Sequence, residues 1–354
     1  ILAGGFFDTF GGTPRGNVVR LEANGLVDPT FTAGTNYTVS VVTTQSDGST
    51  LIGGSFDKVN GVSRTAIARL LTGSRRAPFD FDGDGKTDIG IFRPLAVAEW
   101  WINSSLTGST LALQFGVSTD KIVPADYTGD GKADIGLFRP ASGEWYVLRS
   151  EDFSFFAFPF GTSGDIPVPA DYDADGKADS AVFRPSSATW FINQSGGGGT
   201  RIFQFGVNGD QPVVSDYDGD GKADVGIFRA APGAAEWWIN RSTAGLLAMQ
   251  FGAPTDKAVQ GDYTGDGKTD VAVWRPASGE WFIVRSEDFS YYAFQFGANG
   301  DVPASGDYDG DGKFDTTVFR PSSATWFIGR TTAGTQIVQF GANGDKPIPN
   351  AFVP

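Results

Sequence analysis

The sequence predicts an all-β protein, a β-propeller of seven or eight four-stranded blades. A nine-residue acidic motif occurs six times at a spacing of 45 or 46 residues, which is typical of stacked supersecondary units. The apolar stretches between the copies are short and bounded by turn residues, and no segment carries a helical apolar stripe. The motifs begin at Asp80, Asp126, Asp171, Asp216, Asp262 and Asp307.

One repeat, residues 126–170, illustrates the predicted blade. It contains "IGLF", "EWYVL", "FFAFPF" and "IPVPA", which are four strand-like stretches within 45 residues. The 49 Gly and 19 Pro of the chain supply turns between such short strands.

Repeats that lie 136 residues apart share longer stretches, such as "RPASGEW" in the second and fifth and "RPSSATWFI" in the third and sixth. We infer that a three-blade block was duplicated. Residues 80–354 are therefore expected to form six blades in two blocks, 80–215 and 216–350.

The N-terminal region, residues 1–79, contains a different repeat. "LAGGFFDTFGGTPRGNVVRL" at 2–21 matches "LIGGSFDKVNGVSRTAIARL" at 51–70, so we expect one to two further blades in one continuous propeller. The first of these blades is one strand short. That strand could come from the C-terminal "KPIPNAFVP" (346–354), from a neighbouring molecule, or from sequence upstream of Ile1. Because the chain opens without Met, we expect a signal peptide or further domain to have been removed there.

Two resemblances follow from these motifs. Residues 80–350, with six variants of "DxDGDGKxD…VFRP", resemble FG-GAP/VCBS-type repeats, which are calcium-loop blades of integrin-like propellers. Residues 1–72, with "GGSF…NG…RTAIARL", resemble delta-60 repeats. The resemblance implies a secreted or surface-attached bacterial β-propeller protein, and it does not fix an activity.

The acidic motif has the composition of a calcium loop. Carboxylates at positions 1, 3, 5 and 9 and a backbone carbonyl at position 7 are hard oxygen ligands, and the chain has no His or Cys, which favours calcium over zinc or copper. Position 6 is always Gly, as a turn at positive φ requires. Position 4 is Ala in one copy (Ala174), so we expect ordinary backbone angles there, and the position-7 Lys side chain is expected to point to water.

About six structural Ca²⁺ ions are therefore predicted. Two loops have Thr at position 3 and one carboxylate fewer, so weaker binding is expected in them. The predicted ligands, with each Lys acting through its carbonyl, are Asp80, Asp82, Asp84, Lys86 and Asp88; Asp126, Thr128, Asp130, Lys132 and Asp134; Asp171, Asp173, Asp175, Lys177 and Asp179; Asp216, Asp218, Asp220, Lys222 and Asp224; Asp262, Thr264, Asp266, Lys268 and Asp270; and Asp307, Asp309, Asp311, Lys313 and Asp315.

The charge and composition exclude several functions. The formal net charge is −14, and 22 of the 41 acidic residues lie in the six loops. No basic stripe stands out that could neutralise phosphate charge, which argues against nucleic-acid binding. No apolar run is long enough to span a membrane. The absence of His and Cys removes Ser-His-Asp and Cys-His catalysis. The Glu residues that precede a blade Trp are expected to bind the Arg of "FRP" rather than to act in catalysis; they are Glu99, Glu144, Glu236 and Glu280.

We expect a non-catalytic, calcium-stabilised extracellular protein with a structural or adhesive role, which self-associates into a surface layer or filament. A carbohydrate-binding propeller and a calcium-dependent polysaccharide lyase remain as alternatives. The repeated Trp residues are expected to pack between blades. The aromatic hairpins of the second and fifth repeats are candidate contact surfaces, through Phe153, Phe155, Phe289 and Tyr291.

Overall fold

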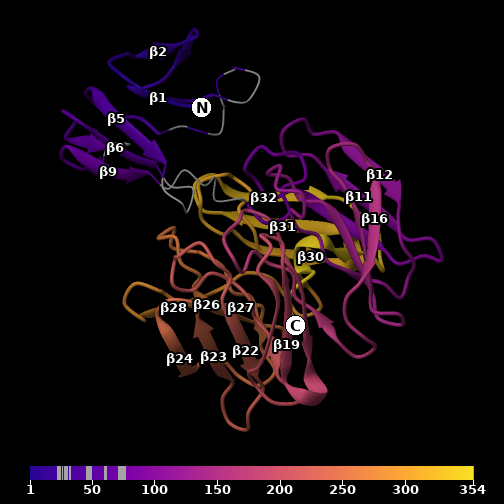
Figure 1. Cartoon of the computed structure of the whole chain (residues 1–354). Coiled ribbons are helices and arrows are strands. Elements are labelled where there is room, and N and C mark those ends of the chain that lie inside the picture. Colours follow the sequence, from indigo (N-terminus) through magenta and orange to yellow (C-terminus); the bar gives the residue numbers. More distant parts are fainter. Residues whose placement is uncertain are drawn as a thin grey trace. The chain divides into compact units, whose positions relative to one another are not determined.

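The computed structural model describes residues 1–21, 25, 27, 31, 33–44, 50–59, 62–70 and 77–353 (Figure 1). The chain divides into two compact units, Ile1–Arg76 and Ala77–Pro354. Apart from three short 3₁₀ helices, η1 (Pro185–Ser187), η2 (Pro321–Ser323) and η3 (Ile348–Asn350), every regular element in the described ranges is a β-strand, as predicted. None of the helices in these ranges has the length and hydropathy needed to cross a lipid bilayer.

The first unit contains short antiparallel strands. β5, β6 and β9 form a three-stranded sheet, while β1 pairs with β4, β2 with β3, and β7 with β8. Their bounds are β1 (Leu2–Gly4), β2 (Thr9–Phe10), β3 (Thr13–Pro14), β4 (Val18–Arg20), β5 (Val39–Thr44), β6 (Thr50–Gly54), β7 (Lys58–Val59), β8 (Val62–Ser63) and β9 (Ile67–Leu70). Val18, Phe31, Ile52 and Phe56 lie in its buried core.

The second unit contains six four-stranded antiparallel sheets. The first strands of the sheets are β33 (Lys346–Pro347), β13 (Lys121–Ile122), β17 (Ile166–Pro167), β21 (Gln211–Pro212), β25 (Lys257–Ala258) and β29 (Val302–Pro303). The second strands are β10 (Ile89–Arg93), β14 (Ile135–Arg139), β18 (Ser180–Arg184), β22 (Val225–Arg229), β26 (Val271–Arg275) and β30 (Thr316–Arg320).

The remaining strands complete each sheet in chain order. The third strands are β11 (Glu99–Asn103), β15 (Glu144–Leu148), β19 (Thr189–Gln194), β23 (Glu236–Arg241), β27 (Glu280–Val284) and β31 (Thr325–Arg330). The fourth strands are β12 (Thr110–Gln114), β16 (Phe155–Pro159), β20 (Gly199–Gln204), β24 (Gly245–Gln250), β28 (Tyr291–Gln295) and β32 (Gly334–Gln339).

Buried aromatic residues form the core of the second unit. One Trp in each third strand is fully buried, and its indole N–H donates to a backbone carbonyl at 2.6–3.0 Å; the six are Trp100, Trp145, Trp190, Trp237, Trp281 and Trp326. Trp237 packs in one cluster with Ala258 and Val273 of the next sheet. The buried Trp of each sheet therefore fills space between neighbouring sheets, and its indole N–H has a hydrogen-bond acceptor.

The six sheets close on one another. β33, near the end of the chain, pairs with β10, with Pro347 opposite Ile91 and Lys346 opposite Phe92. The C-terminal segment therefore supplies the missing strand of the first acidic-loop sheet, and the alternative in which it completes the N-terminal blade is wrong. Because the closure involves six sheets, the predicted count of seven or eight blades is not confirmed.

Candidate metal centre

Each acidic loop folds around the carboxylate at position 1. The N–H groups of positions 4 and 6 donate to its two oxygens at 2.6–2.7 Å and 2.8–2.9 Å in all six copies. This arrangement needs left-handed backbone at both donors. Gly85, for example, has φ of 85°, as predicted for position 6, but Ala174 at position 4 has φ of 64°, so the expectation of ordinary angles there was wrong.

The carboxylates at positions 5 and 9 are also oriented by hydrogen bonds. At position 9, one oxygen accepts the N–H of position 2 at 2.8–3.0 Å. The other accepts a Ser or Thr N–H from the turn between the third and fourth strands of the sheet, at 2.7–2.8 Å. At position 5, one oxygen accepts the N–H of position 7 at 2.8–2.9 Å. The loop and this turn therefore form one rigid unit.

Position 3 differs, because in four loops a buried side-chain oxygen there has no hydrogen-bond partner. These atoms are Thr128 Oγ1, Asp218 Oδ1, Thr264 Oγ1 and Asp309 Oδ1. The other carboxylate oxygen of Asp218 and of Asp309 is bound by backbone and hydroxyl donors, so each side chain is fixed in place. A buried, fixed oxygen without a donor is costly unless a cation binds it.

Carboxylates converge in four of the six loops. In each, three Asp residues have oxygens that all lie within 4.8 Å of one another; the sets are Asp80, Asp82 and Asp88; Asp171, Asp173 and Asp179; Asp216, Asp218 and Asp224; and Asp307, Asp309 and Asp311. The loops with Thr128 and Thr264 form no such set in the part of the chain that the structure describes. The spacing fits one cation bound by oxygen ligands in each of the four loops.

Burial makes the ionised form of these carboxylates unfavourable. It raises the pKa of Asp88 to about 7 and that of Asp80 to about 6, with further contributions from neighbouring carboxylates. Asp307 and Asp315 likewise reach a pKa of about 6. Burial acts in the same direction on Asp309, but hydrogen bonds from Thr332 leave its pKa below the ordinary value. A divalent cation would stabilise the ionised form of all of them.

The loops are joined to one another in a closed ring. The N–H of position 8 in each loop donates to the carbonyl of position 1 in the preceding loop at 2.6–2.8 Å, and Thr87 of the first loop donates to Asp307 of the last. The position-7 Lys side chains were expected to point to water. Lys177 and Lys268 are exposed, and the stems of five of the six lie against the position-4 Gly of the preceding loop, as Lys132 does over Gly83. Each loop therefore contacts the next through backbone and side chain.

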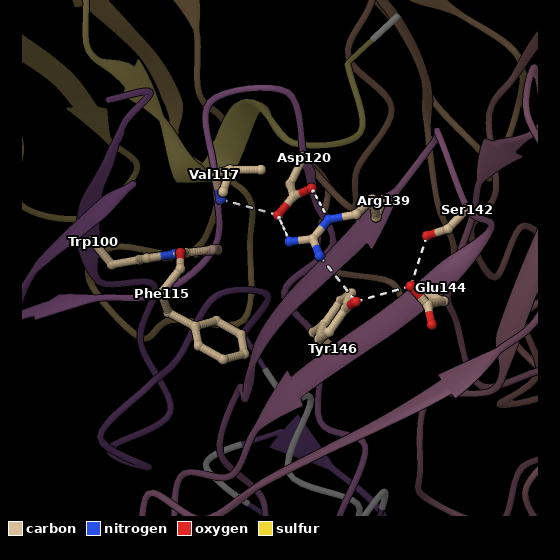
Figure 2. Close-up of polar contacts among 8 residues, drawn as sticks. All are labelled: Trp100, Phe115, Val117, Asp120, Arg139, Ser142, Glu144 and Tyr146. Atoms are coloured by element: carbon tan, nitrogen blue, oxygen red, sulfur yellow. Dashed lines mark hydrogen bonds and ion pairs between the residues drawn. The ribbon is translucent and has the colours of Figure 1, made fainter. Parts of the chain in front are cut away.

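A second repeated cluster lies at the other end of the second strands (Figure 2). Arg139 donates to both oxygens of the buried Asp120 at 2.9 Å and lies 4.4 Å from the Tyr146 ring centroid. Tyr146 in turn donates to Glu144, which also accepts from Ser142. The expected pairing of Glu with this Arg occurs directly at Arg93–Glu99, 3.3 Å, and at Arg229–Glu236, 3.4 Å.

All six sheets contain this Arg–Asp pair, which the sequence reasoning missed. The Asp side chains are at most 1% exposed and their Arg partners 28–35%; the pairs are Arg93–Asp345, Arg139–Asp120, Arg184–Asp165, Arg229–Asp210, Arg275–Asp256 and Arg320–Asp301. The available signal was "FGxxxD", which precedes the first strand of every sheet. Two-point pairing of this kind fixes the Arg and holds the two strands in register.

The aromatic hairpins place their candidate residues in solvent. Phe153 and Phe155 are 54% and 64% exposed, and Phe289 and Tyr291 are 55% and 68% exposed. Phe153 and Phe289 also have positive φ, 57° and 59°, at turn positions where the first sheet has Gly108. A bulky side chain is unfavourable in this conformation.

Family comparisons match two parts of the chain. A domain of unknown function (DUF5122) described as a β-propeller matches residues 1–31 and 45–74. An FG-GAP-like repeat matches residues 171–227, which confirms the FG-GAP resemblance there. The more specific likeness to VCBS and delta-60 repeats stays a prediction. No curated protein matches the chain.

Solved structures with a similar fold have very different sequences. An Agrocybe aegerita lectin that recognises non-reducing terminal N-acetylglucosamine is 15% identical, with 75% of this chain and 90% of that chain covered and a TM-score of 0.47. A catalytically inactive virginiamycin B lyase from Staphylococcus aureus is 7% identical, with 86% and 84% covered and a TM-score of 0.46. A functionally unknown protein from Desulfotomaculum acetoxidans is 10% identical, with 74% and 99% covered and a TM-score of 0.46. These likenesses carry no inference about ligand or reaction.

Proposed function

We propose that this protein is a non-catalytic, calcium-stabilised β-propeller with a structural or adhesive role outside the cell, and that it self-associates. The observation that supports calcium binding best is the buried Oδ1 of Asp218 and of Asp309, each without a hydrogen-bond partner and each beside converging carboxylates of its own loop. All available side-chain ligands are hard oxygens, which suit Ca²⁺, and a flexible six- to eight-fold shell suits Ca²⁺ better than Mg²⁺.

In this proposal the ions are structural: each one cross-links the ligands of its loop. Bound calcium supplies positive charge to each loop, and six ions would reduce the formal net charge from −14 to −2. The position-1 and position-9 carboxylates would hold the ion, while the turn residues that donate to position 9 tie the loop to its own sheet. Because each loop also bonds to the next, filling the sites would rigidify the whole ring.

The proposal that the protein is not an enzyme rests on the likeness of the loops. A catalytic metal keeps an open position beside an acid or base, generally at one place in the protein. Here the carboxylates of all six loops accept hydrogen bonds from the same backbone positions. The Glu residues that begin the third strands bind other side chains: Glu99 binds Arg93, Glu144 binds Ser142 and Tyr146, and Glu280 binds Ser278.

Self-association is proposed to use the aromatic hairpins of the second and fifth repeats. Exposed aromatic residues in strained turns are costly in an isolated molecule, and their repetition 136 residues apart gives one molecule two equivalent patches. Two patches on each copy allow a layer or filament rather than a closed pair. The proposed occupant of each patch is the corresponding patch of a second copy.

Calcium binding is tested by titrating chelated protein in a calorimeter while its melting temperature is followed. We expect about six sites in two classes, the weaker pair belonging to the Thr128 and Thr264 loops, and a large fall in melting temperature on chelation. An unchanged melt with excess chelator would refute the calcium proposal. Self-association is measured separately by sedimentation velocity, where a monomer at all concentrations, with calcium present, would refute the assembly proposal alone.

A further inference from the structure

The first strands of four sheets line a cavity of about 450 Å³ in the second unit. β33, β13, β17 and β21 contribute its walls, together with the segment Asn350–Val353 and nearby residues such as Val168 and Val214. This segment is anchored, because Asn350 Nδ2 donates to the Pro303 carbonyl at 2.7 Å and the Phe352 ring stacks on Phe79 at 6.1 Å. The volume is in the range of pockets that bind small molecules.

Two lysines give this cavity a positive charge. Lys121 and Lys346 occupy equivalent positions of adjacent sheets, opposite Phe138 and Phe92, and both side chains are exposed. Among the described residues, no carboxylate lies within ion-pair distance of either ammonium group. Asp120 also lines the cavity, but both of its oxygens are bound by Arg139.

The fold does not require lysine at these positions. The equivalent residues of the two neighbouring sheets that line the same cavity are Ile166 and Gln211. The equivalent positions of the remaining two sheets, which do not line the cavity, hold Lys257 and Val302. The residue at this position therefore varies from sheet to sheet, and the cavity has lysine on one of its sides only.

The rest of the lining is mostly apolar. It includes Ile122, Pro212, Phe352 and Val353, together with the rings of Pro167 and Pro347. The prolines offer no N–H group to a ligand. Among the lining residues, the two ammonium groups are the positively charged ones.

The acidic loops lie at the opposite end of the strands. Each loop ends at the residue before a second strand, at Asp134 before β14, whereas Lys121 pairs with Phe138 near the far end of that strand. Four residues of extended chain span roughly 13 Å, beyond the Debye length at physiological salt. The negative charge of the loops is therefore largely screened at the cavity.

We infer that this cavity binds a small organic anion, a carboxylate on an apolar body, with the charge held by Lys121 and Lys346 and the body packed on the apolar lining. The site is distinct from the acidic loops and from the aromatic hairpins, and it does not depend on either proposed role. It would give the protein a capacity for small-molecule binding in addition to structure.

The test uses a matched pair of probes, 2-naphthoate and the uncharged 2-naphthamide, titrated calorimetrically into the calcium-loaded protein. We expect naphthoate to bind one site per chain, at least about tenfold more tightly than naphthamide, and more weakly as salt rises. Lys121→Met/Lys346→Met should lose at least about tenfold for naphthoate and leave naphthamide unchanged. The control Lys257→Met, at the equivalent position of a sheet that does not line the cavity, should behave as the wild type.

Measurements on the wild-type protein are enough to overturn the inference: equal affinity for the two probes, or no saturable binding of either, would do so. Binding to the exposed hairpins would show itself as affinity that is insensitive to both the probe charge and the lysine substitutions, and would also overturn it. The melting temperature of the double variant is measured alongside. If that variant is unfolded, the single variants Lys121→Met and Lys346→Met are titrated, and each should lose affinity for naphthoate only.

Discussion

Removing calcium should make the stability of the protein depend strongly on pH. Asp88 has a folded-state pKa of about 7 against an ordinary value of 3.8, chiefly because it is buried, and Asp80, Asp224, Asp270 and Asp307 have pKa values of about 6. A carboxyl whose folded pKa is raised stabilises the fold fully below its unfolded pKa, and that stability is lost as the pH rises through the folded pKa. The metal-free protein should therefore become less stable between about pH 4 and about pH 7.

The magnitude follows from Asp88 alone. Between about pH 5 and about pH 7.5 the unfolded chain has already released the Asp88 proton, whereas the folded protein releases it only near its pKa of about 7. This difference covers roughly two pKa units, and one unit corresponds to 1.36 kcal/mol, so the free energy of unfolding falls by about 3 kcal/mol. The other raised carboxyls act in the same direction but are coupled, so their effects do not simply add. With calcium bound the dependence should reverse, because protons then compete with the ion.

The assay is urea unfolding of calcium-stripped protein in resin-treated buffer, at about pH 5 and about pH 7.5, compared with the same series in excess calcium. Asp152→Asn is a matched control, because Asp152 is exposed in a hairpin and its pKa is lowered by Ser154. This variant should keep the wild-type dependence. A metal-free protein whose stability is flat, or rises, between the two pH values would refute the reasoning.

Three further predictions concern single features. Thr128→Asp/Thr264→Asp should convert the two weaker calcium sites to the stronger class, seen as one class of sites by calorimetry; two persisting classes would contradict the assignment of position 3. Phe153→Gly/Phe289→Gly should keep or raise the melting temperature, since turn strain of about 1 kcal/mol is relieved. The same variant should no longer show concentration-dependent sedimentation, and retained association would exclude Phe153 and Phe289 as contact residues. Asp165→Asn should cost about 3 kcal/mol in urea unfolding, because it removes the carboxylate that pairs with the partly buried Arg184; a loss below 1 kcal/mol would count against the pair.

The all-β class and four-stranded repeat were predictable because they rest on local patterns. Alternation along each strand sets which residues face the core, so Phe156 and Phe158 are partly buried while Phe155 is exposed. The convergence of carboxylates in the acidic loops was predictable in the same way, since the residues of each loop lie within nine positions. Left-handed backbone at position 6 was expected from invariant Gly, and Ala174 shows that the loop imposes the same angles at position 4 even against an alanine.

Features that join distant residues were not predictable in this way. The Arg–Asp pairs link side chains 19 residues apart in five sheets and 252 apart in the sixth. The repeated "FGxxxD" marks the Asp as special, but it does not indicate which residue the Asp pairs with. The partner of the last strand was left open for the same reason. The hydrogen-bond ring between loops involves only backbone atoms, which carry no residue signature.

The pairing of β33 with β10 also sets the order of events during synthesis. Loop-closure entropy rises by only about 0.6 kcal/mol for each doubling of length. Joining Phe92 to Lys346, 254 residues apart, rather than residues 17 apart as in the next sheet, therefore adds roughly 2.3 kcal/mol. This cost in free energy is small, but the pairing is delayed until β33 has been synthesised. The first acidic-loop sheet remains three-stranded, with an open edge, until Lys346 and Pro347 have left the ribosome. Until then, that edge is open to pairing with the wrong strand.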